Sequence, residues 1–83
     1  YNLSTTSIYP IPTRNVLYID KLDTKTTQVD IINIDGKILS TQSVQKNKSQ
    51  LSINTSRFLN GIYFVRFLKN DHTIESKKII VQH

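Results

Sequence analysis

Hydrophobic residues along the chain either alternate with polar residues or form short runs between turn signals. No stretch places them at the i, i+3, i+4 and i+7 spacing of an amphipathic helix, β-branched residues dominate, and alanine is absent. These features favour strands over helices. The pattern predicts strands within residues 8–12, 15–20, 28–34, 37–44, 50–54, 62–69 and 72–81.

About seven short strands that recur roughly every 10 residues, with turn residues between them, are typical of an antiparallel β-sandwich. The densest apolar stretch, 62–69, is expected to be a central strand. Tyr63, Val65 and Phe67 share one face of it. We assign that face to the core because the opposite face carries a charge, Arg66.

Two turn signals predict how the strands connect. Asp35-Gly36 stands between two strand-like segments and predicts a type I′ hairpin, in which both central residues need positive φ. Pro10 and Pro12 fix φ and remove two amide donors. Their segment should therefore be an edge piece or a switch between strands, and not a central strand.

The Asn60-Gly61 turn precedes a tyrosine in a distinctive position. Tyr63 opens a strand just after this turn, four residues beyond Leu59. This placement is typical of a tyrosine corner, in which the phenol hydroxyl caps a backbone group. Gly61 is expected to supply positive φ, and the ring of Tyr63 to pack in the core.

Composition narrows the classes of protein. A chain of 83 residues allows one small domain with a thin core. Without cysteine it has neither a disulfide nor a thiolate metal site, and we expect no metal and no cofactor. No apolar run approaches the ~18–20 residues of a membrane-spanning helix. The polar segment 1–7 is interpreted as the end of a linker from an upstream domain, and 8–83 as the folded domain.

The positive charge does not point to a particular partner. Eleven Lys and Arg residues against six Asp and Glu residues give a formal net charge of +5. These cations are spread along the chain, and only Lys77-Lys78 forms a run, whereas nucleic-acid binding needs cations gathered on one face. We expect no nucleic-acid partner, although a single-strand binder that adds aromatic stacking to this charge stays as an alternative.

We do not expect an enzyme. The two histidines, His72 beside a turn and His83 at the last position, are poorly placed for a nucleophile and base pair. Most carboxylates stand in predicted turns, where Asp is favoured for backbone geometry. Gly36 and Gly61 are each explained by a turn, so no phosphate-binding loop is expected.

The motifs form an ordered series along the chain. They are Tyr9-Pro10-Ile11-Pro12-Thr13, Asp35-Gly36-Lys37, Leu59-Asn60-Gly61-Ile62-Tyr63-Phe64-Val65 and Lys77-Lys78-Ile79-Ile80-Val81. The series resembles the type A C-terminal sorting domain of the type IX (Por) secretion system of Bacteroidetes, over residues 8–83. The resemblance implies an immunoglobulin-like sandwich without catalytic activity, which directs its cargo protein across the outer membrane.

The resemblance also implies partners and a location. The partners are the outer-membrane type IX secretion machinery, an N-terminal cargo domain in the same precursor, and a sortase-like cysteine protease. The protease would remove the domain, with a cut in or before residues 1–7, and the cargo would be released or joined to an anionic lipopolysaccharide. The domain is thus expected in the periplasm in transit, and then at the cell surface or outside the cell.

The family's motifs fall on identifiable residues of this chain. The structural ones fall on Pro10, Pro12, Gly36, Gly61 and Tyr63. The family usually has Asn between its two prolines, and Ile11 stands there in this chain. The residues expected to be recognised by the translocon are Lys77, Lys78, Ile79, Ile80, Val81, Gln82 and His83.

A final strand at a sheet edge would offer backbone donors and acceptors to a receptor. The alternative for Lys77 and Lys78 is that they only solubilise that edge. A rival function is an immunoglobulin-like adhesion or carbohydrate-binding module, which requires an exposed aromatic platform. Two further sets of residues belong to these expectations: Tyr9, Tyr18, Phe58 and Phe64 as the platform, and Phe64 with Leu68 as the contact of a weak homodimer.

Overall fold

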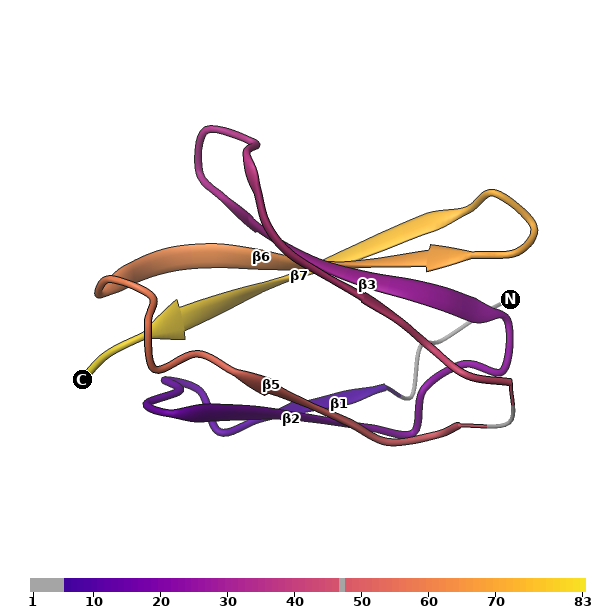
Figure 1. Cartoon of the computed structure of the whole chain (residues 1–83), viewed down its shortest axis with the longest axis horizontal. Coiled ribbons are helices and arrows are strands. Elements are labelled where there is room, and N and C mark those ends of the chain that lie inside the picture. Colours follow the sequence, from indigo (N-terminus) through magenta and orange to yellow (C-terminus); the bar gives the residue numbers. More distant parts are fainter. Residues whose placement is uncertain (1–5, 47) are drawn as a thin grey trace.

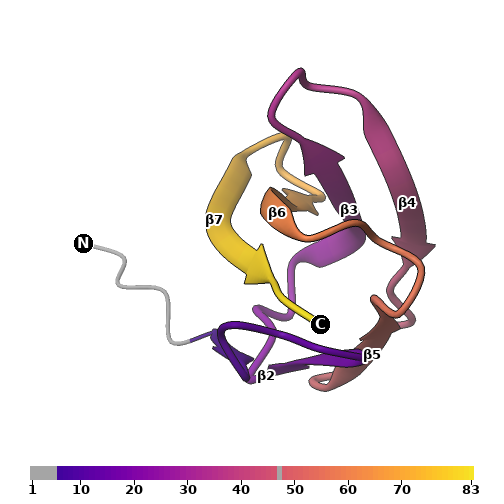
Figure 2. The ribbon, with the colours of Figure 1, turned by 90° about the vertical axis from the view of Figure 1, so that its left-hand side faces the viewer.

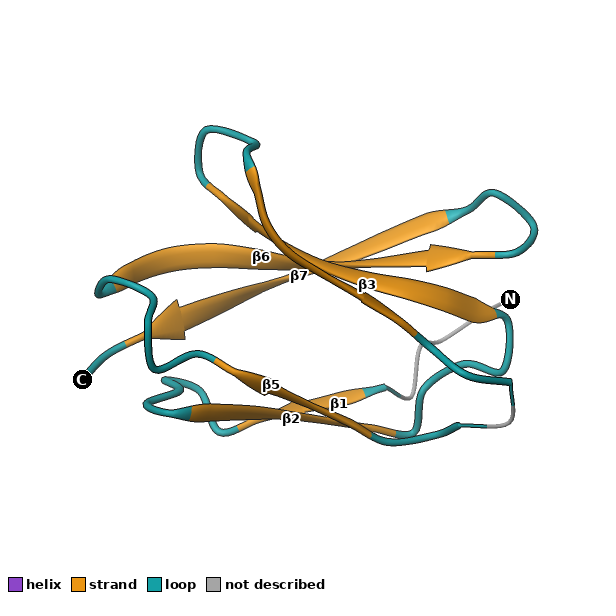
Figure 3. Ribbon diagram, in the orientation of Figure 1, coloured by secondary structure: helices purple, strands orange, loops and turns teal. Residues whose placement is uncertain are grey.

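The computed structural model describes residues 6–46 and 48–83, which form seven strands and no helix (Figures 1 and 3). The smaller of two antiparallel sheets has the order β1 (Ser7–Tyr9), β2 (Val16–Asp20) and β5 (Leu51–Asn54). The larger has the order β4 (Ile38–Ser43), β3 (Thr26–Asn33), β6 (Gly61–Lys69) and β7 (Ile74–Val81).

The two sheets face each other, as the end-on view in Figure 2 shows. This arrangement confirms the predicted all-β, immunoglobulin-like sandwich. Residues 1–5 of the predicted linker lie outside the described residues, and β1 begins at Ser7. Within the described part of the chain, no helix is long and apolar enough to cross a membrane.

The core lies between the sheets and is built by strand alternation. Tyr63, Val65 and Phe67 of β6 are all buried, which confirms their predicted inward face. Full burial of side chains of this size contributes about 1.5–3 kcal/mol each. The buried hydrophobic residues are Leu17, Ile19, Leu22, Val29, Ile31, Ile53, Tyr63, Val65, Phe67, Ile79 and Val81.

The segment after β1 changes sheets. Tyr9 pairs with Tyr18 in the smaller sheet, whereas Thr13 forms a parallel bridge with Val81 in the larger one. Pro10 and Pro12 lie between these two pairings. Since neither proline has an amide hydrogen to offer a ladder, the chain leaves one sheet there and joins the other. The predicted strand switch is confirmed.

The hairpin between β3 and β4 is present, but its predicted turn type is wrong. Gly36 has φ of +85°, whereas Asp35 is not among the residues with positive φ, so the turn is not type I′. The Gly36 amide donates to the Asn33 carbonyl at 3.0 Å. The Asn33 side chain also accepts from the amides of Asp35 and Lys37, at 2.9 Å each. This Asx turn starts the reversal at Asn33, earlier than the Asp-Gly pair suggested.

The predicted tyrosine corner is present at the start of β6. The Tyr63 hydroxyl donates to the Leu59 carbonyl at 2.7 Å, and its ring stacks on Phe58 with 5.3 Å between centroids. Gly61 has φ of +157°, a backbone conformation that residues with a side chain rarely adopt, which confirms the predicted positive φ at this position. The corner fixes the connection from β5 to β6, and β6 in turn aligns β7.

Candidate functional site

The C-terminal strand β7 lies at an edge of the larger sheet, and β6 is the one strand among the described residues that pairs along its length (Figures 1 and 2). Backbone groups of a strand alternate between its two sides. The Ile80 carbonyl accepts a hydrogen bond from the Thr13 amide on the side away from β6. The backbone N–H and C=O groups of the even-numbered residues of β7 therefore point to that side. The backbone N–H and C=O groups of Ser76 and Lys78 therefore point outward, and we call this pair of residues the open edge.

The carboxyl end of β7 is closed by other parts of the chain. The Thr13 amide donates to the Ile80 carbonyl at 2.7 Å, and the Gln82 amide donates to the Thr13 carbonyl at 2.9 Å. The His83 amide donates to the Asn60 side chain at 2.9 Å. One ring nitrogen of His83 lies 2.7 Å from the Phe58 carbonyl. The terminal residues are thus anchored, and the open edge lies upstream of them.

The structure separates the predicted recognition residues by the direction of their side chains. Ile79 and Val81 point into the core and are fully buried. Lys77 also points inward and is half-buried, with its Nζ 3.4 Å from the Thr6 carbonyl oxygen. Lys78 and Ile80 are exposed on the outer face of the sheet. A partner would thus contact the side chains of Lys78 and Ile80 together with the backbone of the open edge.

The outer face beside the open edge is largely apolar. Ile80 is paired with Ile62, and Lys78 with Phe64. Ile62 and Ile80 are exposed, and Phe64 is half-buried. A partner strand added to β7 would therefore find apolar side chains, the ammonium group of Lys78 and the guanidinium group of Arg66, which pairs with Ser76. Side chains beside the backbone groups are what strand addition uses for selectivity.

An ion pair lies on the same face next to Ser76, whose register partner is Arg66. Asp30 of β3 is fully buried although it points to this side, and its Oδ2 lies 3.2 Å from Nη2 of Arg66. The Gln28 side chain also donates to Asp30, at 2.9 Å. Burial of Asp30 was not predicted, because it depends on the side chains that neighbouring strands place over it.

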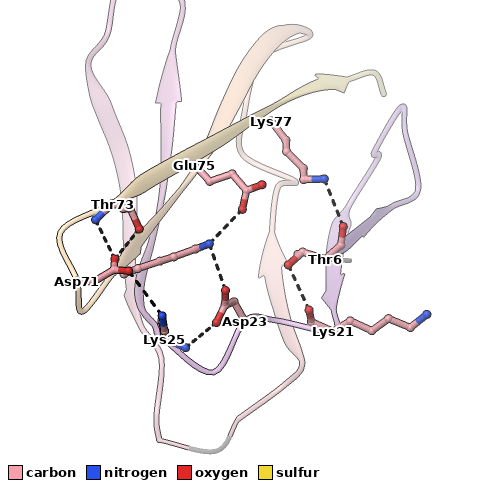
Figure 4. A network of polar contacts seen from close by, with 9 residues as sticks. Thr6, Lys21, Asp23, Lys25, Asp71, Thr73, Glu75 and Lys77 are labelled. Atoms are coloured by element: carbon pink, nitrogen blue, oxygen red, sulfur yellow. Dashed lines mark hydrogen bonds and ion pairs between the residues drawn. The ribbon is translucent and has the colours of Figure 1, made fainter. Parts of the chain in front are cut away.

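The other end of β7 is held by a charge cluster around Lys69, whose partners Asp23 and Glu75 are labelled in Figure 4. The ammonium nitrogen of Lys69 lies 3.2 Å from Oδ2 of Asp23 and 3.6 Å from Oε1 of Glu75. A second pair, Lys25 with Asp71, has a separation of 3.8 Å. The cluster joins the β2–β3 connection to the β6–β7 hairpin.

Three pKa shifts follow from these contacts. The Lys25 amide donates to the carboxylate of Asp23, and together with Lys69 it lowers the pKa of Asp23. Partial desolvation acts to lower the pKa of Lys69, but the hydrogen bonds and charges of Asp23 and Glu75 outweigh it and raise that pKa. The hydroxyl and amide of Thr73 lower the pKa of Asp71. All three shifts favour the charged forms.

The aromatic residues do not form one platform. Tyr9 and Tyr18 stack on the outer face of the smaller sheet, with 5.7 Å between centroids. Phe58 packs against the core, and Phe64 lies on the larger sheet. Only two of the four expected residues therefore share a face. Within residues 6–46 and 48–83, no group of three or more His, Cys, Asp or Glu could hold a metal ion.

The geometry defines a class: an immunoglobulin-like β-sandwich whose C-terminal strand lies at a sheet edge. Residues 7–82 match the family described as secretion system C-terminal sorting domain. The chain belongs to this family, which confirms the resemblance seen in the motifs. Membership identifies it as a sorting domain of the type IX secretion system, for export across the outer membrane to the cell surface or outside the cell.

Two other comparisons add to the fold. CopC from Methylosinus trichosporium OB3b is similar in structure, with a TM-score of 0.52 and 14% identity over 93% of each chain. At this identity the similarity supports the β-fold alone. No curated protein matches the sequence.

Proposed function

We propose that the secretion machinery recognises the folded domain by pairing a strand with the open edge of β7. The observation that supports this is the position of Ser76 and Lys78, whose backbone groups face away from β6 between two anchored ends of the strand. Pairing with backbone groups gives affinity, and Lys78 and Ile80 beside them give selectivity.

The later steps are part of the same proposal. After transit through the periplasm, a sortase-like cysteine protease removes the domain by a cut in or before residues 1–7, and the cargo is released or attached to the cell surface. A cut ahead of Ser7, where β1 begins, leaves every strand of the sandwich intact. Folding and removal of the domain are therefore compatible.

Proline substitutions in the precursor test whether the open edge of β7 is recognised. Ser76→Pro and Lys78→Pro, made together, remove two outward amide hydrogens and add bulk on that side, but spare the amides that bond to β6. Export of the cargo should fall at least about tenfold, equal to ~1.4 kcal/mol of recognition. The measurement is the ratio of surface plus secreted cargo to periplasmic cargo.

The matched control is Thr41→Pro at the opposite edge of the same sheet. The Val44 amide donates toward β3, so the Thr41 amide faces away from it. This variant should be exported normally. Normal export of the β7 double variant would contradict the proposal, provided that its circular dichroism and melting temperature match those of Thr41→Pro. Deletion of 78–83 is less informative, because it also removes the core residues Ile79 and Val81.

A further inference from the structure

A groove of about 560 Å³ extends from the smaller sheet to the end of β4, the edge strand of the larger sheet that lies furthest from β7. It is bounded by Tyr9 and Tyr18 of the smaller sheet, by the start of β5, and by the end of β4 with the loop that follows it. β4 and β7 are opposite edges of the larger sheet, as Figure 2 shows. The volume is within the ~300–1,000 Å³ range of small-ligand sites.

The aromatic part of the groove is the Tyr9–Tyr18 pair. The rings stack at 5.7 Å between centroids with 29° between planes, and 47% and 46% of the two residues is exposed. Tyr9 and Tyr18 lie directly opposite each other on adjacent strands, which keeps the two rings together. Aromatic faces carry partial negative charge, and the slightly positive C–H groups of a sugar ring pack well on them. The pair is thus a rigid surface for a pyranose.

The polar part consists mainly of side-chain amides. Gln42, Gln45 and Gln50 line the groove, and an amide can both donate and accept, as sugar hydroxyls require. The Gln50 amide nitrogen donates to Asp20 at 3.2 Å, which fixes this side chain and turns its donor away. Gln42 and Gln45 line the groove, and within residues 6–46 and 48–83 no side chain or backbone group makes a hydrogen bond to their side chains.

Charge makes the groove unsuited to polyanions. Lys48 is the one cation among its lining residues, and the carboxylate of Asp20 lies beside Gln50. A phosphate-rich ligand would need several cations, and a purely apolar ligand would leave the amides desolvated without partners. A neutral ligand with many hydroxyl groups can pack its C–H groups on the tyrosine pair and hydrogen-bond its hydroxyls to the side-chain amides.

We propose that this groove binds a neutral oligosaccharide, with a sugar ring stacked on Tyr9 and Tyr18 and its hydroxyls hydrogen-bonded to Gln42, Gln45 and Gln50. The inference is independent of the proposed recognition at β7, because the groove and the open edge share no residue. The domain would therefore hold a glycan and the secretion machinery at the same time.

The test is a titration of the ¹⁵N-labelled chain with cellohexaose, maltohexaose and mannohexaose, and with a heparin hexasaccharide as the charged comparison. At least one neutral sugar should shift the amide signals of Gln42, Gln50 and Ser52 in a saturable way, at concentrations up to about 10 mM. Tyr18→Ala should weaken this binding about tenfold or more, whereas Tyr18→Phe should retain most of it.

Leu59→Ala is the control, since Leu59 is 82% exposed and does not line the groove. It should bind like the unchanged chain. Three results would overturn the proposal: no shift with any neutral hexasaccharide, shifts confined to residues outside the groove, or binding of heparin alone that disappears as salt is raised. Melting curves of each variant establish that the fold is retained.

Discussion

Tyr63 combines two stabilising contacts in one side chain. Its ring stacks on Phe58 inside the sandwich, and its hydroxyl donates to the Leu59 carbonyl at 2.7 Å. The hydrogen bond joins the β5–β6 connection to the start of a central strand, so it constrains where β6 begins. The ring alone would fill the core, but it would leave this connection less constrained.

Tyr63→Phe should therefore destabilise the domain by about 1–2 kcal/mol, since it leaves a carbonyl without its donor while keeping the ring. The melting temperature should fall by roughly 4–8 °C for each kcal/mol. Thermal unfolding followed by circular dichroism measures this. Tyr18→Phe is the matched control, because the Tyr18 ring is half exposed on the outer face. Equal melting temperatures for the two variants would show that the corner contributes nothing.

Single residues were predictable where a local signal sufficed. The spacing of Leu59 and Tyr63 predicted the corner, and alternation predicted the inward face of β6. The hairpin at Gly36 was predicted too, but its turn type was not. The competing Asx turn of Asn33 depends on a side chain placed before the Asp-Gly pair, and the dipeptide rule does not consider it.

At the scale of elements, β7 is held at its two ends by different means. Thr13 bonds the carboxyl end through its backbone, and the charge cluster around Lys69 holds the hairpin end. Neither anchor could be predicted, because each joins residues far apart in the sequence. The strand itself was predicted from its local pattern, as were its neighbours, whereas the sheet order depends on long-range pairing that no local pattern contains.

The charge cluster gives the domain a predictable pH dependence. The folded pKa of Asp23 is lowered, so its contribution to stability is present above the unfolded value of about 3.8 and is lost as pH falls through the folded pKa. The folded pKa of Lys69 is raised, so its contribution is present below about 10.5 and is lost as pH rises through the folded pKa. Between these limits the cluster is fully charged.

Asp23→Asn should lower stability at pH 7 by about 0.2–1 kcal/mol, since the pair is partly solvated. The difference from the unchanged chain should shrink as pH falls from the unfolded pKa of about 3.8 through the lower folded pKa, because the carboxylate is then protonated in both states. Urea unfolding at pH 7 and at a series of pH values from 4 down to 2 measures it. Asp35→Asn is the control, because Asp35 makes no ion pair with a described residue. A difference that stays the same size over the whole series from pH 7 to pH 2 would exclude the electrostatic explanation.

At the scale of the whole molecule, the two sheets support surfaces of different character. β7 has the open edge of Ser76 and Lys78, and the groove extends from Tyr9 and Tyr18 to the end of β4. The sequence allowed the family and the C-terminal strand to be predicted, but not which part of that strand is accessible. Ile79 and Val81 show why: they share the motif with Lys78, yet the fold uses them for the core.

Amide hydrogen exchange of the domain, alone and with detergent-solubilised type IX secretion machinery, tests the central claim most directly. Alone, the amides of Ser76 and Lys78 should exchange faster than those of Lys77 and Ile79, which face β6. With the machinery, Ser76 and Lys78 should become protected, and Thr41 on the opposite edge should not. Binding of the machinery without any change at Ser76 and Lys78 would contradict recognition by strand addition.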